Sequence, residues 1–391
     1  MFAFLTRARK ALTRGGIVLA ALSLAACEPM TVGGGGPRID TNAPVPVALL
    51  VPSGSTQSGD NRLAQSLVNA AKLAISDLDG VKIDLRVYPT AGNAQQAANA
   101  ATKAVDDGAK IILGPVYAAA ANAAGVAAAK RGVNVLAFSN NPAIAGGNVF
   151  ILGPTFSNTA DRLMKYAVSQ GKSRIAVVHD TTTAGKAGEA AITAAISAAG
   201  ATKVADETYE FSQNGVTQAA PGIANDIKNG NAQAVFFTAN TAGALPLLTQ
   251  LLSENGVTSS MQQFIGLTRW DIPNSSLSMP GIQGAWFALP DPGMSQQFAS
   301  RYSAAYGQPP LPVTGLAYDG IAAIGALVKS GNANALTAQA LTQPSGFVGV
   351  GGIFRLLRDG TNQRGLAVAQ IVNNQVQVID SAPRSFGGAG L

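Results

Sequence analysis

The chain has 391 residues, of which 12% are charged and 47% apolar, and its formal net charge is +6. This composition excludes a disordered polyelectrolyte, and the length is sufficient for two domains or lobes, each with its own core. Four cations, Arg7, Arg9, Lys10 and Arg14, fall in a segment that we expect to be removed, which leaves +2 on the mature chain. No run of Lys and Arg with interleaved aromatic residues occurs in the sequence, so we do not expect nucleic-acid binding.

The chain contains one cysteine and one histidine, Cys27 and His179. A single cysteine cannot form an internal disulfide, and a Cys/His zinc site would lack ligands. His179 ends an apolar strand pattern, where an imidazole is more often a packed structural residue than a catalytic base. We therefore expect that the protein is not an enzyme and has neither a metal site nor a cofactor.

Residues 1–26 have the pattern of a signal peptide, with a basic start and an apolar stretch over residues 17–24 that is too short to span a bilayer. The small residues before Cys27 resemble the lipobox of bacterial lipoproteins, in which the cysteine is diacylated and becomes the first residue. We expect lipidation at Cys27; ordinary signal cleavage beside an incidental cysteine is the alternative. The predicted location is the periplasm, on a lipid anchor.

The residue after the cysteine is Glu28 and not Asp. By resemblance to the sorting rules of many Gram-negative lipoproteins, this residue favours the outer membrane. Residues 27–44 are predicted to be a flexible tether, since the four consecutive glycines at 33–36 have no persistent structure.

Strand and helix patterns alternate from Val45 onward. Short apolar or alternating runs predict strands, and runs with helical spacing predict helices between them. The predicted strands are residues 46–54, 81–88, 111–113, 133–138, 149–152, 173–179, 203–211, 234–238, 264–267 and 285–289. The predicted helices are residues 61–78, 93–107, 116–131, 159–170, 186–199, 219–228, 242–254, 295–306 and 313–330.

The C-terminal segment does not continue the alternation of strands and helices. Period-two runs within residues 351–379 surround Asp359-Gly360 and Asn373-Asn374, which predicts a β-hairpin or a small meander. Residues 381–391 are expected to be a disordered tail.

The alternation of strands and helices predicts an α/β fold with parallel sheets and right-handed crossovers. About ten strand–helix units are more than a single doubly wound sheet usually contains, so two lobes are expected. The first lobe would comprise residues 45–153 and 290–341. The second lobe would comprise residues 154–283 and 343–380.

Five segments, by their order and spacing, resemble the type I periplasmic binding proteins, specifically the leucine/isoleucine/valine-binding family. The segments are VALLVPSGSTQSGDNRLAQSLVNAAKLAISDL, DDGAKIILGP, RGVNVLAFSNNP, KSRIAVVHDTTTAGKAGEAAITAAISAAG and AVFFTAN. The resemblance covers nearly all of residues 45–330. It implies two Rossmann-like lobes with parallel sheets, joined by a three-stranded hinge and closing over a ligand by hinge motion.

Polar residues follow the carboxyl ends of the predicted strands, where open α/β sheets place their ligands. The predicted ligand-binding residues are Ser53, Ser55, Thr56, Gly114, Tyr117, Ser139, Asn140, Asn141, Asp180, Thr268 and Arg269. Arg269 would hold a carboxylate or another anion, backbone amides after Gly114-Pro115 would add donors, and Tyr117 and Trp270 would stack on an apolar or planar group. The alternative for each hydroxyl and Asn is a role as an ordinary turn former.

The chain departs from its resembled family where amino-acid binders hold the zwitterion. Those proteins resemble one another in having small hydroxyl residues after the third and fourth strands and an acid in the second lobe. After its third predicted strand this chain has Val116-Tyr117-Ala118-Ala119, and after the fourth it has Asn141. At the position of the acid it has Leu267-Thr268-Arg269. Because a buried ammonium without a carboxylate partner is costly, an ordinary α-amino acid is not the expected ligand.

Two functions follow from these patterns. The first is an extracytoplasmic solute-binding lipoprotein that binds a small amino-acid-like or anionic ligand for an ABC permease. The alternative is a non-transport regulator, because SGFVGVGGIFRLLRDGTNQRGLAVAQI resembles the lipoprotein penicillin-binding-protein activators, which use this fold to regulate peptidoglycan synthesis. The altered zwitterion site and Glu28 favour the alternative, since an outer-membrane anchor would leave a solute carrier far from an inner-membrane permease.

Overall fold

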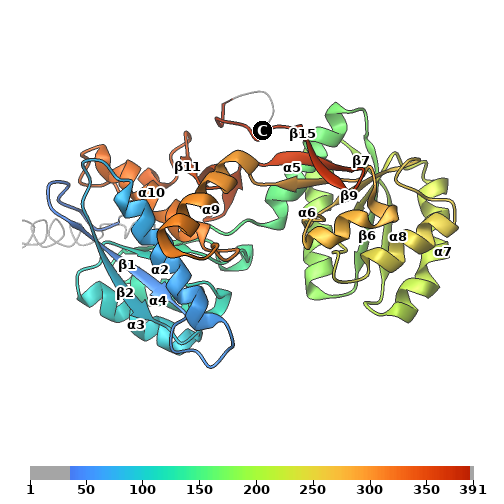
Figure 1. Cartoon of the computed structure of the whole chain (residues 1–391). Helices are drawn as coiled ribbons and strands as arrows, with labels where there is room; N and C mark the ends of the chain where they lie inside the picture. The colour runs from blue at the N-terminus through green and yellow to red at the C-terminus, as the bar shows by residue number, and fades with distance from the viewer. Residues whose placement is uncertain (1–35, 388–391) are drawn as a thin grey trace, which may run out of the picture. The chain divides into compact units, whose positions relative to one another are not determined.

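The structure is a computed structural model that describes residues 36–387. The predicted signal peptide, the lipidation at Cys27, and Glu28 lie outside the described residues, as do residues 388–391. The described chain forms an α/β fold of two lobes, each built around its own sheet (Figure 1).

The first lobe contains a parallel sheet of five strands in the order β2-β1-β3-β4-β5. Every pair of neighbours in this sheet is parallel, as the alternation of strands and helices predicts. The strands are β1 (Val45–Val51), β2 (Ile83–Pro89), β3 (Ile111–Leu113), β4 (Asn134–Ala137) and β5 (Val149–Ile151).

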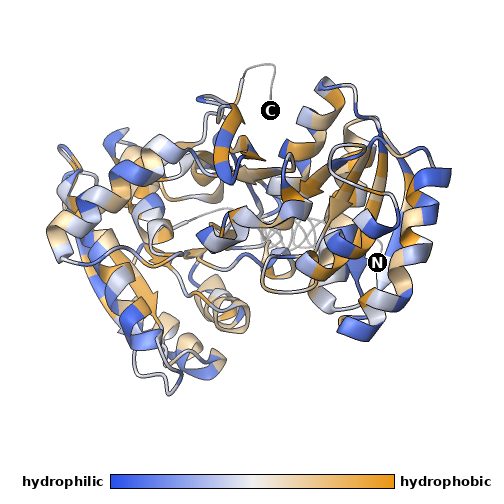
Figure 2. Ribbon diagram, turned by 45° about the vertical axis from the view of Figure 1, so that its right-hand side comes forward, coloured by the Kyte–Doolittle hydropathy of each residue, from blue (hydrophilic) through white to orange (hydrophobic). Residues whose placement is uncertain are grey.

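Helices cover both faces of the first sheet, which explains why its central strands are apolar throughout. Val47 and Leu49 of β1 join a core with α2 (Asp60–Ser76) and α10 (Gly315–Lys329), with α9 (Pro292–Tyr306) beside them. The intervening Ala48 and Leu50 join a second core with α3 (Ala94–Asp106) and α4 (Ala118–Ala129). Figure 2 shows these apolar strands between helices that carry polar outer surfaces.

The second lobe contains a sheet of seven strands in the order β15-β14-β10-β9-β8-β6-β7. The five strands from β6 to β10 are parallel, whereas β14 is antiparallel to β10 and β15 antiparallel to β14. The second sheet thus has the expected parallel strands, to which the C-terminal hairpin adds two antiparallel strands, so that the whole sheet is mixed. The strands are β6 (Arg174–Asp180), β7 (Thr202–Tyr209), β8 (Ala234–Phe237), β9 (Gln263–Gly266), β10 (Trp286–Leu289), β14 (Ala367–Val372) and β15 (Gln375–Asp380).

Two pairs of helices cover the second sheet. Helices α5 (Phe156–Ser169) and α6 (Thr183–Ala198) share a core with one face, and α7 (Gln213–Asn229) and α8 (Leu245–Glu254) share a core with the other. The second lobe thus repeats the layering of the first.

Two antiparallel hairpins form in the C-terminal segment, as its period-two runs predict. Strands β12 (Gly352–Leu356) and β13 (Asn362–Arg364) pair around Gly360, and β14 and β15 pair around Asn373 and Asn374, which both have positive φ. The two hairpins belong to different lobes. Residues Phe347, Phe354 and Leu356 lie in the core of the first lobe, so the expectation that residues 343–380 belong together to the second lobe holds only for β14 and β15.

Three segments connect the lobes: residues 152–155, 290–291 and 365–366. The third crossing therefore lies after β13 and not near residue 342, where we expected it. Side chains bind the crossings to one another. The Asn362 amide donates to the carbonyl oxygens of Ile151 and Gly153 at 2.8 and 2.9 Å, and Arg162 Nε of α5 donates to Leu366 O at 2.7 Å.

Both predicted flexible ends contain packed residues within the described range. Ile39, from the predicted tether, is buried and donates its amide to Ala333 O at 2.9 Å. Ala382, from the predicted tail, lies in the core of the second lobe, and the Arg355 guanidinium stacks over the Phe386 ring at 4.7 Å. Apolar side chains hold these stretches in place, and the compositional argument from glycine overlooked them.

Gly114 has a close approach that explains why a glycine stands after β3. Its φ is +80°, and a Cβ at this position would lie 2.4 Å from Leu50 O. We predict that Gly114→Ala lowers the free energy of unfolding by about 2 kcal/mol more than Gly108→Ala, as measured by urea denaturation. Gly108 is the matched control, because its φ is +95° but no atom lies within 4 Å of the added Cβ. Equal losses would show that the Leu50 carbonyl is not the constraint.

Candidate functional site

The candidate site lies at the carboxyl edge of the first sheet, where β3 and β4 end. A cavity of about 330 Å³ opens there, and four of the predicted residues line it: Tyr117, Ser139, Asn140 and Asn141. The other lining residues are apolar or small and come from the start of α4, the residue after β4, the first crossing and the region where α10 begins: Val116, Ala118, Phe138, Gly153, Pro154, Val313 and Leu316. The cavity is therefore polar along one edge and apolar elsewhere.

Helix α4 begins at this cavity without a side-chain cap. Tyr117 stands at the N-cap position in an extended conformation, and its side chain makes no capping hydrogen bond. Asn93, Thr155, Thr182 and Ser212 cap α3, α5, α6 and α7, whereas α2, α8 and α10 begin without a side-chain cap, as α4 does. An uncapped helix start presents free backbone N–H groups and the positive end of the helix dipole, which together favour an anion.

The Tyr117 side chain is held away from the helix start by Asp60, the first residue of α2. The Tyr117 hydroxyl donates to Asp60 Oδ1 at 2.5 Å, and Asp60 is only 4% exposed. This hydrogen bond, together with burial, raises the pKa of the Tyr117 hydroxyl to about 12. The hydrogen bond to Asp60 therefore fixes the Tyr117 ring at the cavity wall.

The loop after β1 lies beside this pair and outside the cavity lining. An added Cβ on Gly92 would lie 3.0 Å from Asp60 Oδ2 and 3.3 Å from Ser55 Oγ. Ser55 Oγ accepts from the Gln57 amide at 3.0 Å, which is the role of a turn former. Ser53 and Thr56 occupy the same loop, and Thr56 is exposed.

Two of the three polar residues after β4 organise their own turn. Ser139 Oγ accepts from the Asn141 amide at 3.1 Å, and Asn141 Oδ1 accepts from the Ala143 amide at 3.0 Å at the start of a short 3₁₀ helix (Pro142–Ile144). Asn140 is exposed at the cavity, and no side-chain hydrogen bond is described for it within residues 36–387. The Asn140 amide is therefore available to a ligand.

The predicted residues of the second lobe do not line this cavity. Asp180 Oδ1 accepts from the Thr182 amide at 2.9 Å and also from the Thr182 hydroxyl, so it secures the start of α6. Arg269 donates from Nε and Nη2 to the two carboxylate oxygens of Asp271, at 2.6 and 2.5 Å. The buried Thr268 Oγ1 has no hydrogen-bond partner among the described residues.

Trp270 is part of the core of the second lobe. Its side chain is fully buried, donates Nε1–H to Ala239 O at 3.1 Å and packs beneath Gly266, where a Cβ would lie 2.4 Å from the ring. The expectation that Trp270 stacks on a ligand is therefore wrong. Asp60, Val313 and Leu316 are the site residues that sequence reasoning missed, because an acid or an apolar residue at a helix start is common in any helical protein.

His179 belongs to a polar network on the second lobe. Its Nδ1 lies 3.1 Å from Asp180 O, and its Nε2 lies 3.7 Å from Asp206 Oδ1, which in turn neighbours Lys203. Within residues 36–387 no cluster of His, Cys, Asp and Glu is arranged to hold a metal ion. The helices of the same range include none with the length and apolar character needed to cross a membrane.

Comparison with known proteins relates this geometry to one family. A family model described as periplasmic binding protein matches residues 44–375. Comparison with curated protein sequences finds no match.

Solved structures resemble the chain over most of its length. A Rhodospirillum rubrum protein described as a branched-chain amino acid ABC transporter is 18% identical with a TM-score of 0.73, covering 86% of this chain and 100% of its own. A substrate-binding protein from Desulfitobacterium hafniense in complex with Leu is 16% identical with a TM-score of 0.61, covering 86% and 100%. A solute-binding protein from Rhodopseudomonas palustris BisB5 in complex with 3,4-dihydroxy benzoic acid is 19% identical with a TM-score of 0.56, covering 87% and 98%. At these identities the likeness shows the fold.

The Tyr117–Asp60 pair yields a prediction on pH. Because the folded protein raises the pKa of Tyr117 from 10.0 to about 12, the phenol binds its proton more tightly in the folded state. The stability that this contributes is complete below pH 10 and is lost as pH rises from 10 to about 12. We predict that Tyr117→Phe costs about 1.5–3 kcal/mol at pH 7, since the charged acceptor Asp60 loses its donor, and that the cost shrinks across this pH window.

The measurement is urea denaturation of both proteins at several pH values. Asp60→Asn serves as the control, because it keeps an acceptor near the phenol but removes the charge, and should shift the window back toward pH 10. A cost that does not change between pH 9 and pH 12 would contradict the assigned pKa.

Proposed function

We propose that this chain, which belongs to the periplasmic binding protein family, is an extracytoplasmic solute-binding protein that captures a small carboxylate for an ABC importer. The uncapped start of α4, which opens into a cavity with a polar edge and apolar walls, is the observation that carries the proposal. A carboxylate there would accept hydrogen bonds from the first amides of α4 and from the Asn140 side chain. Val116, Phe138 and Leu316 would surround its apolar part.

The charges around the cavity favour a ligand without an ammonium group. Asp60 is only 4% exposed and its Oδ1 accepts from the Tyr117 hydroxyl. Its Oδ2 has no hydrogen-bond partner among the described residues, but it lies near Gly92 and Ser55, and Asp60 does not line the cavity. In the second lobe, Asp271 is paired with Arg269 and Asp180 with Thr182. Since a desolvated ammonium needs a carboxylate partner, a simple aliphatic or aromatic acid is a better ligand than a zwitterion.

The related structures with bound ligands agree with the carboxylate class. The Desulfitobacterium hafniense protein holds Leu and the Rhodopseudomonas palustris protein holds 3,4-dihydroxy benzoic acid, and both ligands carry a carboxylate. For this chain, the second of these chemistries, an acid with a planar apolar body, is the one that we propose.

The proposed location is the periplasm, on a lipid anchor. The family name places the fold outside the cytoplasm, and the small residues before Cys27 resemble a lipobox. Two or three acyl chains on Cys27 would attach the protein stably, at roughly 0.8 kcal/mol for each buried CH₂ group. Glu28 favours the outer membrane as the site of this anchor.

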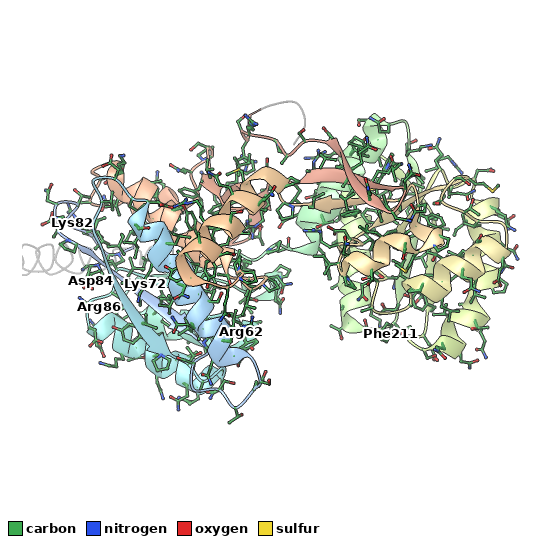
Figure 3. The ribbon with its side chains drawn as sticks, viewed as in Figure 1. Arg62, Lys72, Lys82, Asp84, Arg86 and Phe211 are labelled. Atoms are coloured by element: carbon green, nitrogen blue, oxygen red, sulfur yellow. The ribbon has the colours of Figure 1, made fainter. Side chains whose placement is uncertain are left out.

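The second lobe supports a second candidate, a regulator that binds a penicillin-binding protein. Phe211, Met261 and Ile272 are apolar, more than half exposed, and all on this lobe; Figure 3 shows Phe211 projecting from its surface. Two cavities, of about 610 and 360 Å³, adjoin one another at Pro246 of α8, and Phe211 lines the smaller one. Of the three, Phe211 lines a groove, and an exposed aromatic residue beside a groove is typical of a protein interface.

The carboxylate site can be tested by placing an acid at the start of α4. We predict that Ala118→Asp keeps the protein folded, because an acid in the first turn stabilises a helix by about 0.3–1 kcal/mol. It should nevertheless weaken benzoate binding at least tenfold, through repulsion between two like charges, a cost of about 1.4 kcal/mol or more. Isothermal titration calorimetry measures the affinity.

Ala94→Asp is the matched control for this experiment. Ala94 begins α3, on the same edge of the sheet, but Asn93 already caps that helix and Ala94 does not line the cavity. Benzoate should bind this control as it binds the natural protein. Unchanged binding by the Ala118 variant would remove α4 from the site.

The two candidate functions differ in their effect on a purified penicillin-binding protein. A regulator should raise its rate of glycan polymerisation, and Phe211→Ser should abolish the increase, while a carrier should leave the rate unchanged. Val126→Ser is the control, because Val126 is 68% exposed but lies on the first lobe. Both substitutions are at the surface and should change stability by less than about 0.5 kcal/mol. No change of rate with the natural protein would dismiss the regulator.

A further inference from the structure

Another cavity, of about 450 Å³, lies where the three crossing segments meet. We call it the second cavity, and the cavity at the start of α4 the carboxylate cavity. Pro154, Pro290 and Leu366 bring one residue from each crossing to its lining, and α9 and α10 supply much of the rest. The walls are largely apolar, with Phe298, Leu311 and Val350 among them. The cavity is thus suited to an apolar group of considerable size.

One end of the second cavity contains an ion pair, whose net charge is zero. Asp319 of α10 is 1% exposed and accepts from Arg364 Nη1 at 3.1 Å and from the Val350 amide at 2.8 Å. Arg364 also donates from Nε to Leu152 O at 3.2 Å and stacks over the Phe354 ring at 5.2 Å. Because the two charges neutralise one another, the cavity attracts neither an anion nor a cation.

The second cavity adjoins the carboxylate cavity. Pro154, Val313 and Leu316 line both, so they form a ridge between the two spaces. Pro154 is exposed and Val313 half-buried, which leaves the top of the ridge at the surface. A ligand anchored at the start of α4 can therefore extend across the ridge into the second cavity.

From this arrangement we infer that the natural ligand is an elongated acid, whose carboxylate lies at α4 and whose apolar body extends over the ridge into the second cavity. The inference rests on the proposed function and adds the length and shape of the ligand to it. An acid as small as benzoate or leucine would fill only the first space. Each cavity alone is near the lower limit for a ligand pocket, whereas both together accommodate a molecule of about twice that size.

The alternative is that the second cavity binds an effector molecule other than the ligand held at the start of α4. The shared ridge favours a single ligand, since two molecules would compete for contact with the same Pro154, Val313 and Leu316 side chains. The neutral Asp319–Arg364 end admits the terminal hydroxyl or amide of such a ligand but opposes a second carboxylate.

The test is a series of ω-phenyl carboxylates, from benzoate through 3-phenylpropionate and 4-phenylbutyrate to 5-phenylvalerate, titrated into the protein by calorimetry. We expect the affinity to rise about fourfold for each methylene that enters apolar surroundings, until the second cavity is filled. Ala299→Phe should remove this gain and leave benzoate binding unchanged, because Ala299 lines the second cavity only. Ala305→Phe, on an exposed position of the same helix, is the matched control and should keep the gain.

Each other outcome has a distinct meaning. Benzoate binding without any gain along the series would overturn the elongated ligand and leave the proposed function intact. A gain that survives Ala299→Phe would show that the body lies elsewhere, and would overturn the role of the second cavity. A protein that binds no member of the series loses the proposed function and, with it, this inference.

Discussion

The burial of both faces of each central sheet is the constraint on which the rest of the structure depends. Strands such as β1 and β3 are apolar at every position because α2 and α10 cover one face and α3 and α4 the other. No polar side chain can project from the middle of such a sheet without losing its hydration. Chemistry is therefore confined to the strand ends, and the loops after β3 and β4 carry the cavity with Tyr117 and Asn140. The same confinement leaves the second lobe with its polar residues at the ends of β6 and β9.

The two lobes use these strand ends differently. In the first lobe, α4 begins without a side-chain cap, and its first residue, Ala118, lines the cavity. In the second lobe, the polar residues satisfy one another, as Arg269 does with Asp271 and Asp180 with Thr182. A binding protein that closes on its ligand would be expected to offer donors from both sides. The proposed carboxylate site therefore lies on the first lobe, and the groove beside Phe211 lies on the second. This asymmetry is what makes both candidate functions consistent with one fold.

Much of the fold could be predicted from the sequence, because apolar runs that end in glycine, proline or asparagine mark the strands directly. The turn at Asn373 and Asn374 could also be predicted, since consecutive asparagines tolerate positive φ. The sequence could not predict to which lobe β11 (Phe347–Gly349) and β12 belong. The apolar side chains of a short hairpin do not indicate which core they will join. The residues of the candidate site were harder to predict than the fold. Its polar edge followed from the strand ends, but the roles of Asp60, Val313 and Leu316 depend on contacts between segments far apart in the chain.

The division of the C-terminal hairpins between the lobes has a consequence for how the protein is made. The first lobe is incomplete until α10 and β12 are added, and the second lacks β14 until the last residues arrive. Neither core is complete before these C-terminal residues are available, and contacts between segments far apart in the chain are in general slow to form. A chain that crosses a membrane through a narrow channel must remain unfolded until it has passed. This order of segments suits the export that the predicted signal peptide would direct, because the residues that complete both cores stand near the end of the chain.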